Sequence, residues 1–221
     1  MVPSCAAFYY ALSLLKVPLM GKVSWTAPQW LTLLLIVASS HILYAFVWYK
    51  TPAFKKLCKG VLGKVLMNKK PVKVFGKLVL LFKAVQQLSL LVWAFSLVLG
   101  LTTVGAAIGF VLNTSTVQKA VAVVLIAVGQ CLNVAIYKAI GTNGVYYGFK
   151  LGAPVPWSTA FPFSAGYRHP QYVGGYITQL GVLLLLASPK TIEAGLVPLA
   201  AWWAICYTAT SIVEASGDND N

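Results

Sequence analysis

Residues 30–49, WLTLLLIVASSHILYAFVWY, decide the class of fold. An α-helix needs about 20 predominantly apolar residues to cross the hydrocarbon core of a bilayer, and this stretch has that length. Trp and Tyr stand at its two ends, where aromatic side chains anchor a helix at the membrane–water interfaces. The stretch therefore predicts a transmembrane helix.

Further apolar stretches predict more helices of the same kind, at residues 78–100, 117–137, 172–188 and 196–213. Lys83 and the Gln86-Gln87 pair weaken the first of these, which could continue through residues 104–112. Pro189-Lys190-Thr191 joins the last two stretches and predicts a helical hairpin. We expect an all-α fold, a polytopic integral membrane helical bundle with four or five transmembrane helices and a cytosol-facing cofactor site.

The composition of the 221-residue chain agrees with a membrane protein. Hydrophobic residues make up 59% and charged residues 10%, against roughly 45–50% and 25% in soluble domains. All four acidic residues come after residue 192, so carboxylate-pair catalysis and acidic metal sites are excluded before it; they are Glu193, Glu214, Asp218 and Asp220. The four cysteines have no CxxC spacing, and we predict no metal site.

The lysines between residues 50 and 77 predict the orientation in the membrane. They are Lys50, Lys55, Lys56, Lys59, Lys64, Lys69, Lys70, Lys73 and Lys77. The positive-inside rule places this connection in the cytosol. Tracing the helices onward brings residues 138–171 and the C-terminus to the same face. The net charge of +13 favours anionic lipid headgroups as partners, rather than nucleic acid.

Residues 129–175 are dense in glycine, proline and aromatic residues, and they contain the single arginine of the chain, Arg168. His169 follows it, and Pro170 has the fixed φ that suits a first helical turn. A helix N-terminus beside an arginine is a natural site for a carboxylate or phosphate. Alternatively, Arg168 and His169 only anchor the end of a helix among lipid headgroups.

A spaced glycine series, with Tyr146 and Tyr147 inside it, forms a second motif, at Gly141, Gly144, Gly148 and Gly152. It is not a dinucleotide-binding fingerprint, because no strand pattern precedes it. It predicts either a loop that approaches a flat, charged cofactor or tight helix packing. Glu214 follows the last apolar stretch, where its carboxylate could bind an amine or accept a proton. Alternatively, it is a solvated residue at the end of a helix. For His41, inside the first stretch, we predict a hydrogen bond between helices.

The motifs GQCLN, YYGFKLG, PW, FPF and RHPQYVG begin at residues 129, 146, 156, 161 and 168. At this spacing they resemble the membrane-embedded phospholipid N-methyltransferases, most of all the plant-type phosphatidyl-N-methylethanolamine N-methyltransferases. The wider group includes isoprenylcysteine carboxyl methyltransferases. The resemblance runs from about residue 78 to residue 214. It implies N-methylation of the ethanolamine-type headgroup of a membrane phospholipid, toward phosphatidylcholine, with S-adenosylmethionine as methyl donor.

The resemblance, together with the aromatic residues suited to adenine or sulfonium, implies a set of cofactor contacts: Gly141, Gly144, Tyr147, Gly148, Arg168, His169, Pro170, Tyr172 and Glu214. His169 and Glu214 are also the candidate catalytic bases that take a proton from the acceptor ammonium. Lys150 and Trp157 are candidate substrate contacts. Many members of the family have two adjacent glutamates at the last position, whereas this chain has Glu214-Ala215.

These observations predict three regions: residues 1–77 with the first transmembrane helix and the Lys-rich cytosolic loop, a methyltransferase core at 78–214, and a polar tail at 215–221. We expect a phospholipid substrate in the bilayer and a location in the endoplasmic reticulum membrane, with the active site facing the cytosol. Carboxyl methylation of a prenylated cysteine and a non-catalytic lipid-binding role remain as alternatives.

Overall fold

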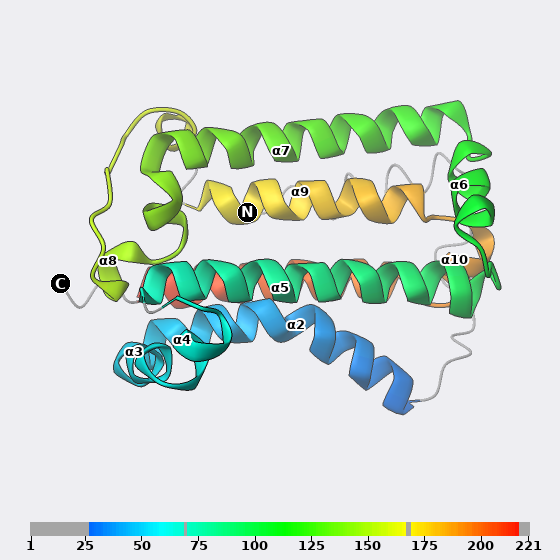
Figure 1. Cartoon of the computed structure of the whole chain (residues 1–221). Coiled ribbons are helices and arrows are strands. Elements are labelled where there is room, and N and C mark those ends of the chain that lie inside the picture. The colour runs from blue at the N-terminus through cyan, green and yellow to red at the C-terminus, as the bar shows by residue number, and fades with distance from the viewer. Residues whose placement is uncertain (1–26, 69, 167–168, 217–221) are drawn as a thin grey trace.

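The computed structural model describes residues 27–68, 70–166 and 169–216, and within these residues it contains helices and no strands. The long helices run between the two ends of a bundle, and each runs in the direction opposite to the next long helix along the chain (Figure 1). They are α2 (Ala27–Tyr49), α5 (Pro71–Leu91), α7 (Thr116–Val145), α9 (Pro170–Leu185) and α11 (Leu196–Ser216). The predicted all-α class is confirmed.

Four helical segments are long and apolar enough to cross a membrane: Gln29–Tyr49, Pro71–Val98, Thr116–Leu151 and Leu196–Ala215. The protein is therefore an integral membrane protein with four long spans among its described residues. Helix α9 has 16 residues, which at about 1.5 Å per residue is roughly 24 Å. It lies along α7 and reaches nearly from one end of the bundle to the other (Figure 1).

The connections gather at the two ends of the bundle (Figure 1). At one end lie the Lys-rich helices α3 (Thr51–Lys59) and α4 (Val61–Val65), the short helix α8 (Gly148–Leu151) and the last turn of α11. At the other end lie α6 (Val104–Leu112) and α10 (Pro189–Glu193). The Lys-rich connection, the glycine-rich segment and the end of α11 thus share one end, as the tracing from the sequence predicted.

Two helix boundaries differ from the expectation. Helix α5 begins at Pro71, because proline fits a first helical turn, and it continues as the π-helix η1 (Val92–Val98). Gly100, with a φ of +69°, then separates it from α6. Helix α7 extends to Val145, although Gly141 interrupts its regular geometry with a φ of +65°. Residues 138–145, expected as loop, are therefore mostly helical.

His41 bears out an expectation from the sequence. His41 Nδ1 lies 2.8 Å from Thr210 Oγ1, which is the hydrogen bond between helices that the sequence predicted. Cys58 and Cys206 are buried, while Cys131 is exposed on α7. Burial raises the pKa of the Cys58 thiol in α3, which suits a packing role. Cys5 lies outside the described residues.

Helices α7 and α9 pack closely because glycines meet at their contact. A Cβ placed on Gly129 would lie 2.5 Å from the carbonyl oxygen of Gly174. A Cβ on Gly174 would in turn lie 2.9 Å from the carbonyl oxygen of Gly129. Small residues that let two backbones approach are the usual device for helix association in membranes.

We expect Gly129→Ala to destabilise the protein, because the added methyl group overlaps the backbone of α9. Overpacking of this kind costs about 1–3 kcal/mol, and it would show as a lower thermal unfolding temperature in lipid nanodiscs. Gly109→Ala in α6 is the matched control, because a Cβ there has no atom within 4 Å. Equal unfolding temperatures for the two variants would contradict the assigned contact.

Candidate functional site

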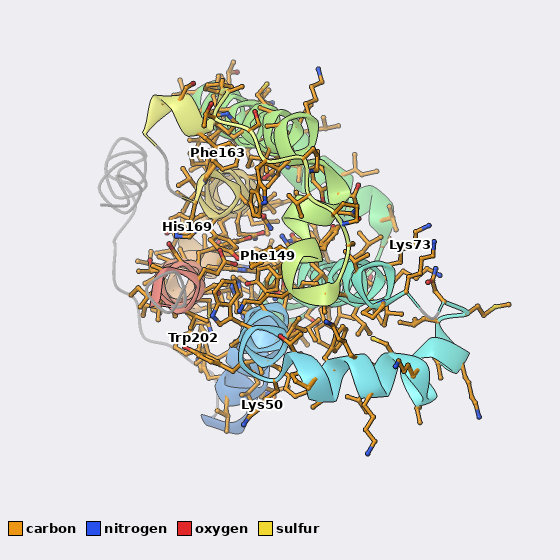
Figure 2. All side chains as sticks on the ribbon, turned by 90° about the vertical axis from the view of Figure 1, so that its left-hand side faces the viewer. Lys50, Lys73, Phe149, Phe163, His169 and Trp202 are labelled. Carbon is orange, nitrogen blue, oxygen red and sulfur yellow. The ribbon has the colours of Figure 1, made fainter. Side chains whose placement is uncertain are left out.

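A cavity of about 190 Å³ lies at the end of the bundle that carries α3, α4 and α8. The polar side chains that line it come from the α7–α8 turn, from α9 and its N-cap, and from the last turn of α11. They are Tyr147, His169, Gln171, Tyr172 and Glu214. Viewed from this end, His169 lies between α9 and α11, whereas Lys73 projects at the opposite side of the bundle (Figure 2).

The Glu214 carboxylate is the centre of this group. The hydroxyls of Tyr147 and Tyr172 both donate to its Oε1, and its Oε2 lies 3.2 Å from His169 Nδ1. The side chains of His169 and Glu214 are 18% and 13% exposed. Three groups, from the α7–α8 turn and from the start of α9, therefore fix the orientation of one largely buried carboxylate. The bond to His169 strengthens when the imidazole is protonated.

The local fold explains how Tyr147 reaches Glu214. Tyr147 has a φ of +53°, in the left-handed region, and it forms the N-cap of α8. This conformation reverses the chain after α7 and directs the tyrosine into the bundle, where it is buried. Gly148 follows because a Cβ there would lie 2.7 Å from the Asn143 carbonyl oxygen.

His169 has one nitrogen without a partner. It forms the N-cap of α9, and Pro170 occupies the first turn. Its Nδ1 is paired with Glu214, but its Nε2 is buried and has no hydrogen-bond partner among the described residues. Buried polar groups are nearly always paired, so an unpaired nitrogen in a cavity wall indicates a place for a polar group of a ligand.

Aromatic rings form the outer wall of the cavity. Trp48, at the end of α2, packs on Tyr147 with ring centroids 5.2 Å apart. Lys150 Nζ lies 4.0 Å from the centroid of the Trp48 ring. Phe149 and Trp157 are 5.6 Å apart, and Trp157 is 68% exposed, so this pair forms the rim. The cavity thus combines one buried acid with aromatic faces that favour a cationic ligand.

The structure brings most of the predicted site residues together: Gly144, Tyr147, Trp157, His169, Pro170, Tyr172 and Glu214 all line the cavity. Gly141 lies at the kink of α7, where an added Cβ would lie 3.7 Å from the Pro156 side chain. Lys150 stacks on the outer wall, and Gly148 shapes the turn. Arg168 lies outside the described residues.

Trp48 and Phe149 are cavity residues that sequence reasoning missed. The sequence suggests only an interface anchor at Trp48, and its place in the wall depends on how α2 packs against α3 and on its ring contact with Phe149 of α8. Phe149 carried a readable signal, because it is an aromatic residue inside the YYGFKLG motif.

The comparisons with known proteins cover the same part of the chain. Residues 117–216 match the phospholipid methyltransferase family model. A 59-residue segment is 46% identical to the phosphatidyl-N-methylethanolamine N-methyltransferase of Arabidopsis thaliana, covering 27% of this chain. The match spans about a third of that relative, 35% of its length. No solved structure matches. The resemblance drawn from the motifs is confirmed, and the cavity residues from Ile136 to Glu214 lie inside the matched segment.

Proposed function

We propose that this protein, which matches the phospholipid methyltransferases over residues 117–216, uses S-adenosylmethionine to methylate the ethanolamine-type headgroup of a membrane phospholipid, toward phosphatidylcholine. The observation that carries the proposal is the Glu214 carboxylate, held by Tyr147, Tyr172 and His169 in a cavity at one end of a membrane bundle. A carboxylate held in one orientation inside such a cavity suits a substrate or cofactor that carries an amine.

The cavity residues fit S-adenosylmethionine, whose sulfonium would supply the methyl group. Its methionine part has a carboxylate and an amine. The unpaired Nε2 of His169 can bind the first, and the Glu214 carboxylate can pair with the second. The rings of Trp48 and Tyr147 can face the positive sulfur. Arg168, next to His169, is a further candidate for the carboxylate.

The chain's own residues then position the reactants and remove a proton. Methyl transfer depends chiefly on the alignment of the two reacting atoms, which a rigid cavity supplies. The acceptor amine arrives mainly as ammonium and must lose a proton before it can attack. Glu214 Oε2 and His169 Nδ1 lie 3.2 Å apart, so a proton taken by either group can be shared within the pair. The hydroxyls of Tyr147 and Tyr172 keep the carboxylate in place.

The Lys-rich helices suit the membrane surface. Phe54 and Cys58 face the core of the bundle, while the exposed lysines Lys56, Lys59 and Lys64 face outward. Anionic headgroups would attract them by about 1 kcal/mol for each lysine near the surface. This supports a cytosolic position for this end of the bundle, and with it a cytosol-facing site. The endoplasmic reticulum membrane is the location that the resemblance implies.

The experiment is methyl transfer by the purified protein in mixed lipid vesicles with labelled S-adenosylmethionine. Ethanolamine, monomethyl and dimethyl phospholipids and a prenylcysteine analogue are offered one at a time. We expect label in the phospholipids only, and the best acceptor identifies the step. Label only in the prenylcysteine ester would replace the proposal with carboxyl methylation. Folded protein that labels no acceptor would favour the lipid-binding alternative.

A further inference from the structure

A second cavity, of about 210 Å³, lies deeper in the bundle than Glu214. Its wall includes His41, which is two helical turns from the end of α2, and Lys83 of α5. Gln171 and Tyr172 line both this cavity and the one at Glu214. The two cavities are therefore neighbours, and the Tyr172 ring lies between them.

Lys83 is the unusual member of this wall. It is half-buried in the span Pro71–Val98, and it forms no hydrogen bond or ion pair within the described part of the chain. A lysine inside a membrane span is costly, and such residues generally face the bundle interior and serve an ion or substrate. Among the described residues, no carboxylate lines the cavity. Lys83 thus lacks the anion that would balance its charge.

The other polar groups of the cavity suit an anion with several oxygen atoms. Gln130, Asn133 and Tyr207 bring amide and hydroxyl groups, all of which can donate hydrogen bonds. Val79 and Leu80 add apolar surface on the α5 side. A cation, several neutral donors and an apolar wall together match a phosphodiester that is attached to hydrocarbon chains.

The cavity meets the surface of the bundle between α5 and α7. Leu80 and Tyr137 belong to its wall, yet they are 68% and 41% exposed on the outside of the two helices. Toward the Glu214 end, the Tyr146 ring closes α7 against α5, since a Cβ on Gly76 would lie 3.1 Å from that ring. In a membrane, a ligand would therefore enter from the side, among the lipid chains.

We propose that this second cavity receives the phosphodiester of the acceptor phospholipid, with Lys83 as its counter-charge, so that the amine end reaches past Tyr172 toward Glu214. The inference rests on the proposed function, because it names the acceptor side of the same site. It also assigns different residues to the two reactants. Lys83 serves the lipid, whereas His169 and Glu214 serve the methyl donor and the proton.

The test is photo-crosslinking of the full-length protein in nanodiscs without methyl donor. The probe is a monomethylethanolamine phospholipid with a diazirine near the glycerol end of one acyl chain, and a diazirine diacylglycerol is the phosphate-free control. Lys83→Met is compared with Lys83→Arg and with Lys119→Met. Lys119 is a half-buried lysine at the far end of α7, bonded to the Leu112 carbonyl. Thermal unfolding confirms that each variant is folded.

We expect Lys83→Met to reduce phospholipid crosslinking to residues 79–83 by about 10- to 100-fold, as for a lost hydrogen bond to a charged group. Crosslinking should persist in Lys83→Arg and Lys119→Met, and diacylglycerol capture should not depend on Lys83. Equal crosslinking in wild type and Lys83→Met would overturn the proposal. Competition by millimolar inorganic phosphate would assign the cavity to free phosphate and overturn the lipid assignment.

The result is independent of catalysis, because no methyl group is transferred in the assay. A protein that captures the phospholipid through Lys83 but methylates no acceptor would support the cavity assignment and refute the proposed function. A protein that methylates phospholipids, but whose lipid crosslinking is the same in wild type and Lys83→Met, would support the proposed function and refute the cavity assignment.

Discussion

Glu214→Gln is expected to lower the turnover number for phospholipid methylation by about 10²- to 10⁴-fold, the usual contribution of a positioned acid or base. The substitution keeps the shape of the side chain, and its amide oxygen can still accept the hydroxyls of Tyr147 and Tyr172. It removes the negative charge that pairs with His169. The turnover number should therefore fall while the protein stays folded, and an unchanged thermal unfolding temperature would verify the second point.

Glu193→Gln is the matched control for this prediction. Glu193 is the other glutamate of the chain, and it is exposed in α10 at the opposite end of the bundle. We expect its loss to leave turnover unchanged. Turnover of Glu214→Gln within twofold of wild type would refute the role of the carboxylate.

His169→Ala is expected to weaken the binding of S-adenosylmethionine by about 10- to 100-fold, since a hydrogen bond to a charged group is lost. The reason is the buried Nε2, which has no hydrogen-bond partner among the described residues and belongs to a side chain of the cavity wall. Titration calorimetry without lipid acceptor measures this affinity directly. A fall in turnover should accompany it, because Nδ1 also pairs with the proposed base.

The chain has two histidines, which allows a close comparison. His41→Gln removes an imidazole that is bonded to Thr210 in the deeper cavity, so donor affinity should stay the same. Unchanged donor affinity in His169→Ala would remove His169 from the donor site. Activity retained in both His169→Ala and Glu214→Gln would remove the base role from both residues.

The fold could be predicted from the sequence because apolar length alone reveals a membrane helix. Residues 30–49 needed no partner to be recognised, and Pro170 marked the start of α9. The end of α7 could not be predicted, because Gly141 looks like a helix breaker in the sequence. The chain takes one positive φ there and then resumes its helix.

The candidate site was predictable to the extent that its residues lie in motifs. His169, Tyr172 and Glu214 were identified from residue chemistry and resemblance, and they do meet in one cavity. Their mutual contacts were beyond the sequence, because they depend on where α9 and α11 meet. Trp48 illustrates the limit, since it lies in a different part of the chain and reaches the cavity only through tertiary packing.

The glycine contact between α7 and α9 also bears on the precision of the cavity. Gly174 comes two residues after Tyr172, so the backbone contact with Gly129 clamps α9 within one turn of its cavity residues. This contact fixes the position of α9 relative to α7, and so helps to set the distance between Tyr172 and the Glu214 carboxylate. A larger residue at Gly129 would therefore lower activity by displacing Tyr172, although residue 129 itself contacts neither reactant. Loss of activity at that glycine would report on alignment, not on chemistry.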